Sequence, residues 1–276
     1  MPELPEVETT RRGVEPWVYG RQITDLVVRN PDLRWPVRLP HDLIGAKIDS
    51  VQRRGKYLLF MVSQGAILIH LGMSGSLRVV PCGDPPRKHD HVDIVFGQRC
   101  IRLNDPRRFG CVLHIEQDVW EHPLLRDLGV EPLGNEFSGE WLFARSRNRK
   151  VAVKNFIMDS KQVVGVGNIY AAESLFSAGI RPTVQARRVS LKAYQTLAGA
   201  IRSVLSRAIS RGGTTLRDFV NSQGNPGYFQ QELFVYGRDG EPCRICETVL
   251  KAKQIGQRSS VYCPKCQTFQ AFRPPI

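Results

Sequence analysis

The chain has 276 residues, of which 42% are hydrophobic, so it can bury a substantial core and is long enough for two domains and a small third module. Its 39 Lys and Arg residues against 26 Asp and Glu residues give a formal net charge of +13, which favours a polyanionic partner: nucleic acid first, an acidic membrane surface second. Its apolar runs are shorter than the roughly 20 residues that span a bilayer, and a signal-peptide pattern is lacking. We therefore expect a globular protein of the cytosol that is not bound to a membrane.

The chain begins with MPELPEVE, which places a proline second and a carboxylate third. Removal of Met1 would turn Pro2 into a secondary amine, and α-amino groups, with a reference pKa of roughly 8, are partly unprotonated near neutral pH. Pro2 with Glu3 beside it is therefore a candidate nucleophile with an acid/base partner. The alternative interpretation is that Pro2 merely permits methionine removal and that Pro5 occupies the first turn of a helix.

Periodicity divides the next part of the chain into one helix and a set of strands. Early carboxylates and late arginines predict a short helix over residues 4–12, with Pro2 and Glu3 just ahead of it and Gly13 after it. Short apolar or alternating runs between Gly and Asp/Pro turns then predict a β-sandwich or barrel-like domain. Its expected strands are residues 57–62, 66–73, 91–96, 100–104 and 111–115.

After Pro132 the pattern becomes helical. Apolar residues at helical spacing predict a helix within residues 190–211, capped by Ser190 and ended by Gly212 and Gly213. A second helix is expected to begin at Asn168, capped by the Asn168 side chain, and to stop at Gly179. The glycine-rich run 163–167 before it would let backbone N–H groups approach a DNA phosphate, although a simple connection between helices explains the run nearly as well.

Four of the seven cysteines form two C-x2-C pairs sixteen residues apart, close to the end of the chain. Each pair can hold a metal from a tight turn, and the stretch between the pairs is long enough for a β-hairpin, so one tetrahedral Zn²⁺ fits better than a redox or coincidental arrangement. Four protein ligands leave no open position, so this metal would be structural. The predicted ligands are Cys243, Cys246, Cys263 and Cys266, and the other three, Cys82, Cys100 and Cys111, are expected to be small core residues.

Basic residues and an aromatic residue recur at the ends of the expected strands. Basic groups beside an exposed aromatic suit phosphate binding and base stacking, whereas each cluster alone is more often a solvated rim. Their repetition in one basic chain favours nucleic acid. The clusters are Arg53, Arg54 and Lys56; His70 with Met73; Lys88, His89 and His91; and the turn from Asp105 to Gly110, which contains Arg107, Arg108 and Phe109.

Taken together, these stretches resemble the bacterial formamidopyrimidine-DNA glycosylase family. The resemblance rests on MPELPEVE, Lys56, HLGMSG at 70–75, DPRRFG at 105–110, VGVGNIY at 164–170 and the four-cysteine module, in order over nearly the whole chain. It implies an α+β fold with an N-terminal β-sandwich, a helical domain with a helix-two-turn-helix and a C-terminal zinc finger. The expected bounds are 1–131, 132–235 and 236–270, followed by a tail at 271–276.

The resemblance also implies an activity. The family excises oxidised purines such as 8-oxoguanine and formamidopyrimidines from duplex DNA and then cuts the strand at the abasic site by β,δ-elimination. Pro2 is implied as the nucleophile that forms an iminium with the sugar, Glu3 as the acid/base, Lys56 as the proton donor in β-elimination and Arg258 as the donor in δ-elimination. Because arginine, with a pKa above roughly 12, is a poor acid, we expect Arg258 mostly to hold phosphate.

The remaining implied residues contact the DNA. Extruding a base leaves a hole in the duplex, which the resemblance assigns to Met73, Arg107 and Phe109. It implies that His70, His89, Arg149, Lys154 and Asn168 contact phosphates and that Glu173 lies near the lesion pocket. Residues 214–228 would cover the flipped purine. Arg149 stands where the family usually has lysine, which keeps the charge but changes the geometry. Arg217 and Asn225 also replace what are commonly lysines, so the preference among oxidised purines is less defined than the reaction.

Two other interpretations compete with this one. The related endonuclease VIII-like branch shares the proline nucleophile but favours oxidised pyrimidines, and the purine-branch arrangement of Met73, Arg107 and Phe109 argues against it. A non-catalytic zinc-ribbon DNA-binding protein would have no need of Pro2, Glu3 and Lys56. The expected partner is damaged double-stranded DNA, the expected cofactor is one structural Zn²⁺, and a monomer in the bacterial cytosol, associated with the nucleoid, is the expected state.

Overall fold

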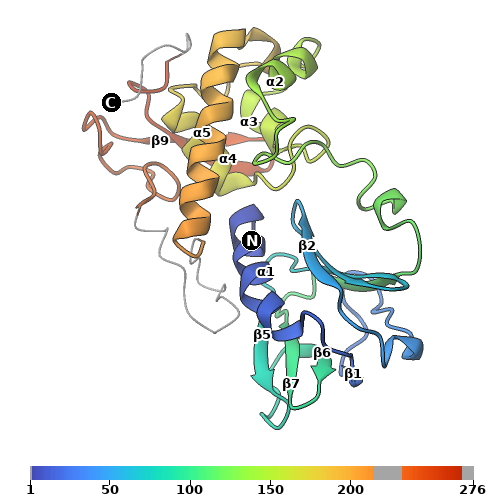
Figure 1. The fold of residues 1–276 in the computed structure, drawn as a ribbon. Helices are drawn as coiled ribbons and strands as arrows, with labels where there is room; N and C mark the ends of the chain where they lie inside the picture. Colours follow the sequence, from blue (N-terminus) through green and yellow to red (C-terminus); the bar gives the residue numbers. More distant parts are fainter. Residues whose placement is uncertain (1, 214–231, 269–276) are drawn as a thin grey trace. The chain divides into compact units, whose positions relative to one another are not determined.

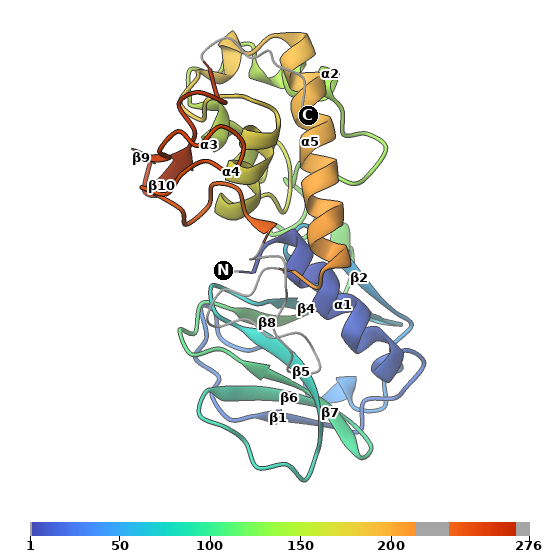
Figure 2. The same cartoon turned by 90° about the vertical axis from the view of Figure 1, so that its left-hand side faces the viewer.

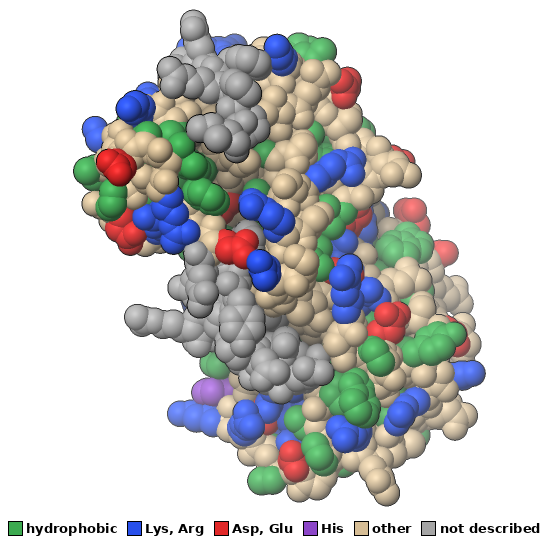
Figure 3. All heavy atoms as spheres, turned by 60° about the vertical axis from the view of Figure 1, so that its left-hand side comes forward, with side chains coloured by type: hydrophobic (Ala, Val, Ile, Leu, Met, Phe, Trp, Pro, Cys, Tyr) green, Lys and Arg blue, Asp and Glu red, His purple; other side chains and the backbone are tan. Residues whose placement is uncertain are grey.

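The computed structural model describes residues 2–213 and 232–268. The chain divides into two compact units (Figures 1 and 2), one formed by Met1–Asp127 with Ala208–Gln230 and the other by Leu128–Arg207 with Gln231–Ile276. Lys and Arg side chains are spread over the face drawn in Figure 3. Within the described ranges, no helix is both long and apolar enough to cross a membrane.

The first unit is built on two four-stranded antiparallel sheets, which form the expected β-sandwich. One sheet has the strand order β2-β3-β4-β8 and the other β1-β6-β7-β5. The strands are β1 (Asp25–Val28), β2 (Ser50–Arg54), β3 (Tyr57–Val62), β4 (Gly65–His70), β5 (Ser76–Pro81), β6 (Asp90–Phe96), β7 (Arg99–Asn104) and β8 (Cys111–Ile115), and two short 3₁₀ helices cover His41–Leu43 and Val119–Glu121.

Three strands, β1, β2 and β5, were not expected, and the strand predicted over 66–73 ends at His70. Each of the three lies at an edge of its sheet. An edge strand has one solvated flank and can carry polar residues, so its hydrophobic pattern is often weaker than that of a central strand. In β2, for example, only Val51 is buried.

Helix α1 (Leu4–Val18) is longer than the predicted 4–12 and continues through Gly13 and Pro16. Burial explains the extension, because Val14 and Val18 are at most 1% exposed in the core of the sandwich. Burying each valine contributes on the order of 1.5–3 kcal/mol, so the two together can offset the roughly 1 kcal/mol cost of a glycine and the roughly 3 kcal/mol cost of a proline inside a helix.

The second unit is mainly helical, with α2 (Gly139–Ser146), α3 (Val153–Met158), α4 (Asn168–Ser177), a 3₁₀ turn at Ala186–Arg188 and most of α5 (Leu191–Ser210), whose last three residues belong to the first unit. Ser190 caps α5 as predicted, since its Oγ accepts the Ala193 N–H at 3.2 Å. The capping prediction for α4 is wrong. Its N-cap is Gly167, and Asn168 is the first helical residue, whose side chain points to Ser259 instead.

The end of the second unit is a small module around the hairpin of β9 (Lys251–Ile255) and β10 (Arg258–Tyr262). This hairpin lies between the two cysteine pairs, as expected. Apolar residues of the module, including Val235, Leu250 and Val261, pack against Ala172 and Phe176 of α4. The module is therefore anchored on the same helix that contributes Asn168 and Glu173.

Candidate nucleic-acid interface and metal centre

Pro2 and Glu3 immediately precede α1, as predicted. Both residues are buried, with Glu3 only 1% exposed. Glu3 is the N-cap, and it forms a capping box with Glu6: its carboxylate accepts the Glu6 N–H, while the Glu3 N–H donates to Glu6 Oε2 at 2.9 Å. This reciprocal pair fixes the first turn, so the backbone that carries Pro2 has a defined direction.

Lys56 occupies the two-residue turn between β2 and β3, where Arg54 pairs with Tyr57. Gly55, the first residue of the turn, has φ +57°, a left-handed conformation that a two-residue hairpin commonly assigns to glycine. Tyr57 in turn pairs with His70 at the end of β4, and their rings lie 4.9 Å apart. The register therefore brings Lys56 and His70 to the same end of this sheet.

His70 is held as a neutral imidazole. Burial, with the nearby cations Lys56 and Arg34, lowers the His70 pKa from 6.5 to about 4. Its Nδ1 accepts the backbone N–H of Gly72 at 3.0 Å, so the proton resides on Nε2. His70 can therefore present one N–H donor to an acceptor such as a phosphate oxygen without carrying a charge.

Two connections between the sheets present Met73 and Phe109. One joins β4 to β5 and the other joins β7 to β8; since His70 pairs with Cys111 and Ser76 with Asn104, both cross at the same end of the sandwich. Met73 is 36% and Phe109 42% exposed, and the Arg107 guanidinium lies 4.9 Å from the centre of the Phe109 ring. Exposed apolar side chains beside a cation suit insertion into a base stack.

Asp105 ties these two connections together. Its side chain is fully buried, Oδ2 accepts the Gly110 N–H at 2.7 Å and Oδ1 lies 3.5 Å from Ser74 Oγ. The backbones also touch, because a Cβ on Gly72 would lie 2.5 Å from the Gly110 nitrogen. No side chain larger than hydrogen fits there without a shift, so the two connections form one preformed unit.

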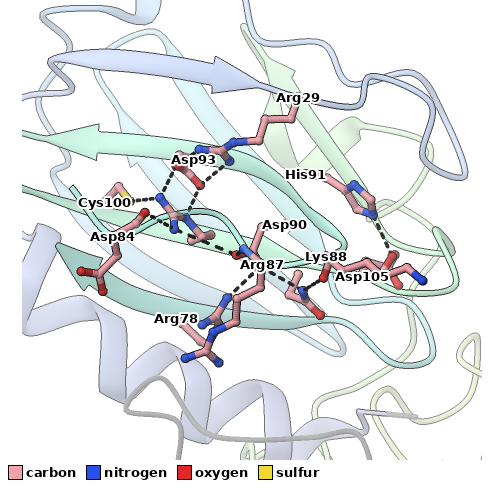
Figure 4. Close-up of polar contacts among 12 residues, drawn as sticks. Arg29, Arg78, Asp84, Arg87, Lys88, Asp90, His91, Asp93, Cys100 and Asp105 are labelled. Atoms are coloured by element: carbon pink, nitrogen blue, oxygen red, sulfur yellow. Dashed lines mark hydrogen bonds and ion pairs between the residues drawn. The ribbon is translucent and has the colours of Figure 1, made fainter. Parts of the chain in front are cut away.

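His89 lies half-buried in the connection before β6, with φ +73°, a strained conformation for a residue other than glycine. Its carbonyl accepts the Asp105 N–H at 3.0 Å, and Asn104 Nδ2 donates to the neighbouring Lys88 carbonyl. A buried ion network underlies this connection (Figure 4): Asp93 binds Arg102 and Arg29, and Asp90 binds Arg78 and the Arg87 N–H. The sheet therefore holds His89 in a costly backbone conformation.

In the second unit, Lys154 and Asn168 meet at the β9–β10 hairpin. The Lys154 ammonium, on a side chain only 1% exposed, donates to Ser260 Oγ at 2.6 Å and to the Ser259 carbonyl at 3.3 Å. Asn168 Nδ2 donates to the same carbonyl at 3.3 Å. The exposed Arg258 is the residue immediately before Ser259, so both side chains fix the strand that carries it.

The Glu173 carboxylate is buried and accepts three backbone N–H groups, those of Phe234, Val235 and Tyr236, at 2.8–3.0 Å. Burial raises the Glu173 pKa, and these three donors oppose the rise. Its contacts are to the segment that follows residues 214–231. The predicted covering stretch 214–228, with Arg217 and Asn225, lies outside the described residues, as does the tail at 271–276.

Arg149 is exposed in the second unit, and its carbonyl accepts the Arg187 N–H at 3.1 Å. Of the three cysteines expected in the core, Cys100 and Cys111 are buried in β7 and β8. Cys82 is only half-buried, so that expectation was wrong for it. The residue lies just beyond β5, where the edge of the sheet faces solvent and the core no longer covers it.

The other four cysteines form a compact metal site. Their Sγ atoms all lie within 4.8 Å of one another, with separations of 3.9 Å for Cys243–Cys266, 3.5 Å for Cys246–Cys263 and 3.4 Å for Cys246–Cys266. A tetrahedral ion with Zn–S bonds of about 2.3 Å separates its sulfurs by about 3.8 Å. The donor set therefore fits one Zn²⁺, which leaves no open position for a substrate.

Two contributors to the site were not predicted as such. The sequence shows Asp105 only as part of its motif, although a carboxylate ahead of a Pro-Arg-Arg turn is a common acceptor for turn N–H groups. The sequence indicates only that Arg53 is one of several basic residues. Its ion pair with Glu8, at 3.1 Å, joins residues 45 positions apart, so only the packing of β2 against α1 shows it.

Family models match three successive parts of the chain: the formamidopyrimidine-DNA glycosylase N-terminal domain at 1–112, the helix-two-turn-helix domain of that enzyme at 128–220, and a zinc finger found in these glycosylases and in isoleucyl-tRNA synthetase at 240–268. Among similar proteins, the formamidopyrimidine-DNA glycosylase of Hahella chejuensis is 58% identical over 270 residues, 97% of this chain and 100% of the relative. That of Cellvibrio japonicus is 56% identical over 269 residues, with the same coverage.

Solved structures agree. The MutM (Fpg) protein of Thermus thermophilus aligns with a TM-score of 0.87 at 37% identity, covering 96% of this chain and 98% of that protein. The Lactococcus lactis Fpg in complex with DNA containing an abasic site aligns with a TM-score of 0.89 at 32% identity, covering 96% and 99%. The four cysteines thus hold one structural zinc, the partner is DNA, and the chain belongs to the formamidopyrimidine-DNA glycosylase family of base-excision-repair enzymes, which are DNA glycosylases with abasic-site lyase activity.

Proposed function

We propose that this chain removes oxidised purines, 8-oxoguanine and formamidopyrimidines, from double-stranded DNA through a covalent intermediate on Pro2. The observation that supports the proposal most directly is the fixed first turn of α1, whose N-cap is the buried Glu3 that follows Pro2 in the chain. A Lactococcus lactis relative is described in complex with Fapy-dG DNA. We propose further that the chain works as a monomer in the bacterial cytosol, at the nucleoid.

In this mechanism the Pro2 nitrogen bonds to the anomeric carbon as the bond to the damaged base breaks, and the sugar ring opens to an iminium ion. Glu3 exchanges protons beside the sugar. A secondary amine gives an iminium that stays charged without an added proton, so it acidifies the adjacent sugar C–H. Loss of that proton expels one flanking phosphate, and a second elimination expels the other.

The remaining residues of the proposed site contact phosphates or fill the gap that the extruded nucleotide leaves in the duplex. Lys56 donates a proton and contacts phosphate during β-elimination, and the exposed Arg258 holds the phosphate of the δ-elimination step. His70 donates through Nε2 as a neutral ring, while His89, Arg149 and Asn168 contact the backbone. Lys154 acts on DNA through the hairpin it supports, and Glu173 through the segment it anchors beside the lesion pocket.

The exposed pair Met73 and Phe109 supports the insertion step. When the damaged nucleotide leaves the stack, Phe109 would wedge the neighbouring bases, Met73 would fill the gap and Arg107 would hydrogen-bond the orphaned base, usually cytosine. Unstacking costs a few kcal/mol, and apolar area on preformed connections can offset part of it. This arrangement favours oxidised purines over the oxidised pyrimidines of the endonuclease VIII-like branch.

Borohydride trapping tests the proposal. The protein is mixed with duplex DNA containing 8-oxoguanine opposite cytosine, reduced, and digested for peptide mass spectrometry. We expect the DNA on Pro2, loss of trapping when Met1 is retained, and a loss of at least about tenfold for Pro2→Gly, which keeps only a primary amine. Pro5→Ala, a proline change in the same helix turn, serves as the control and should trap at the parental level.

Two results would contradict the proposal. One is robust strand cleavage by a preparation in which Met1 is fully retained. The other is a strong preference for thymine glycol over 8-oxoguanine in paired excision assays, which would place the chain in the pyrimidine branch.

A further inference from the structure

Glu8 is the centre of a charged cluster that links α1 to the β2–β3 hairpin. Its side chain is 11% exposed, and its two oxygens accept from Arg11 at 3.1 and 3.2 Å, from Arg12 Nε at 2.8 Å and from Arg53 Nε at 3.1 Å. Burial opposes ionisation, but the hydrogen bonds from Arg11 and Arg12 hold the Glu8 pKa below its ordinary value. The carboxylate is therefore charged at neutral pH.

Of these three arginines, only Arg53 lies on the hairpin. Its Nη1 donates to the carbonyl of Gly55 at 3.0 Å, and its side chain is 11% exposed. Gly55 and Lys56 are the whole of the turn, so the hydrogen bond acts on the peptide group that joins Gly55 to Lys56. A continuous set of contacts thus runs from Glu8 on the first helix, through the Arg53 guanidinium, to the backbone of Lys56.

We propose that the Glu8–Arg53 pair is a positioning device that fixes Lys56 relative to the N-terminal nucleophile. The inference rests on the proposed roles of Pro2 and Lys56 and adds two residues to that site. Neither of the two touches the substrate in this scheme. They act through the turn backbone, because Lys56 must meet a leaving phosphate while Pro2 holds the sugar.

A merely structural role is the alternative, since α1 also needs to be attached to the sheet. Arg11 already provides such an attachment, because its Nη1 donates to the Val51 carbonyl of β2 at 3.2 Å. Arg53 differs in that its second contact ends on the turn. If it positions Lys56, its removal affects the lyase step more than the stability of the fold.

The test compares Arg53→Met with Arg12→Met. Both variants remove one cation from Glu8, but Arg12 is 60% exposed and lies on the helix itself. The measurement is the single-turnover rate of strand cleavage at a preformed abasic site, with thermal unfolding in parallel. A displacement of about 1 Å can cost on the order of 100-fold, so we expect Arg53→Met to slow cleavage by about 10- to 100-fold and Arg12→Met to stay within about twofold.

The same pair is then measured in a Lys56→Ala background. If Arg53 acts through Lys56, Arg53→Met causes no further slowing there, whereas an independent effect multiplies the two losses. Equal fold-losses in both backgrounds would overturn the inference while leaving the role of Lys56 intact. A Lys56→Ala variant that cleaves at the parental rate would instead overturn the proposed function of Lys56.

Arg53→Lys provides a second readout that does not depend on whether Arg53→Met folds. A lysine keeps the charge opposite Glu8 but lacks the fork that lets one guanidinium bond Glu8 and Gly55 at once. We expect Arg53→Lys to slow cleavage by at least about threefold, less than Arg53→Met does, with an unfolding temperature close to that of the parent. Full activity with Arg53→Lys would show that charge alone suffices and would overturn the positioning role.

Discussion

His70 shows how a single residue acquires its role from its surroundings. The sequence offers a histidine after an apolar strand, which equally suits a charged phosphate ligand or a core residue. In the fold, the Gly72 N–H donates a hydrogen bond to His70 Nδ1, and burial beside Lys56 and Arg34 disfavours the charged imidazolium form. The ring is therefore a neutral donor, and in the proposed site the charge for phosphate binding would come from its neighbours.

The lowered pKa of His70 should make the free energy of unfolding depend on pH. Because the folded pKa of about 4 lies below the ordinary 6.5, the unfolded chain binds more protons than the folded chain between these pH values. His70 thus destabilises the fold progressively as the pH falls from about 6.5 towards 4. We expect the His70 ring signals in NMR spectra to titrate near pH 4, and His70→Gln to flatten the pH dependence of the free energy of unfolding in that window. A His70 titration midpoint near 6.5 would contradict the neutral-donor role.

At the scale of elements, the connections that carry Met73 and Phe109 follow from strand order. Both link the two sheets at one end, so they must run side by side, and Asp105 with Gly72 and Gly110 joins them. The carboxylate accepts from both connections, so removing it leaves the buried Gly110 N–H without its partner. Such a loss costs about 1–3 kcal/mol.

We therefore expect Asp105→Ala to lower the free energy of unfolding by about 1–3 kcal/mol and to reduce 8-oxoguanine excision by about tenfold or more. Cleavage at a preformed abasic site should fall less, since no base has to be displaced there. Asp84→Ala removes an exposed carboxylate just beyond β5 as a control and should leave both rates unchanged. Equal losses on the two substrates would argue against a role in base extrusion.

Elements differed in how far the sequence alone could predict them. Strands β3 and β8 were predicted to the residue, because both have a clear apolar pattern, although β8 lies at an edge of its sheet. Strands β1, β2 and β5, which lie at sheet edges, were not predicted. The predicted α1 was too short, because Gly13 and Pro16 weaken the local helix pattern, whereas the burial of Val14 and Val18 depends on tertiary packing that the local sequence does not show. Sequence motifs identified the candidate site, but long-range pairs such as Glu8 with Arg53 are visible only once the packing of α1 against β2 is known.

For the whole molecule, the zinc module matters because it carries Arg258, the residue proposed to hold phosphate in δ-elimination. The hairpin that holds Arg258 lies between the two cysteine pairs, and Lys154 and Asn168 attach it to the helices of the same unit. Four thiolates brought this close repel one another unless a cation binds them. The metal is thus expected to hold Arg258 in place without taking part in the reaction.

Removal of zinc should accordingly weaken DNA binding. We expect chelation to release one zinc per chain, to lower the unfolding temperature and to reduce affinity for abasic-site DNA by at least about tenfold, because metal binding contributes folding free energy. Restoring zinc should reverse the losses, which serves as the control for chelator damage. Unchanged affinity after complete metal removal would count against the structural role.

The joined connections also bear on how a lesion is found. Asp105 and the close glycine contacts order the connections that carry Met73 and Phe109 in advance, so in the proposed insertion step these two residues would lose little conformational entropy. Discrimination at this stage then comes from the duplex: weakly stacked or mispaired nucleotides yield at lower cost than intact ones. With Met73 and Phe109 held rigidly in this scheme, the ease with which a DNA base step deforms would be the first signal of damage.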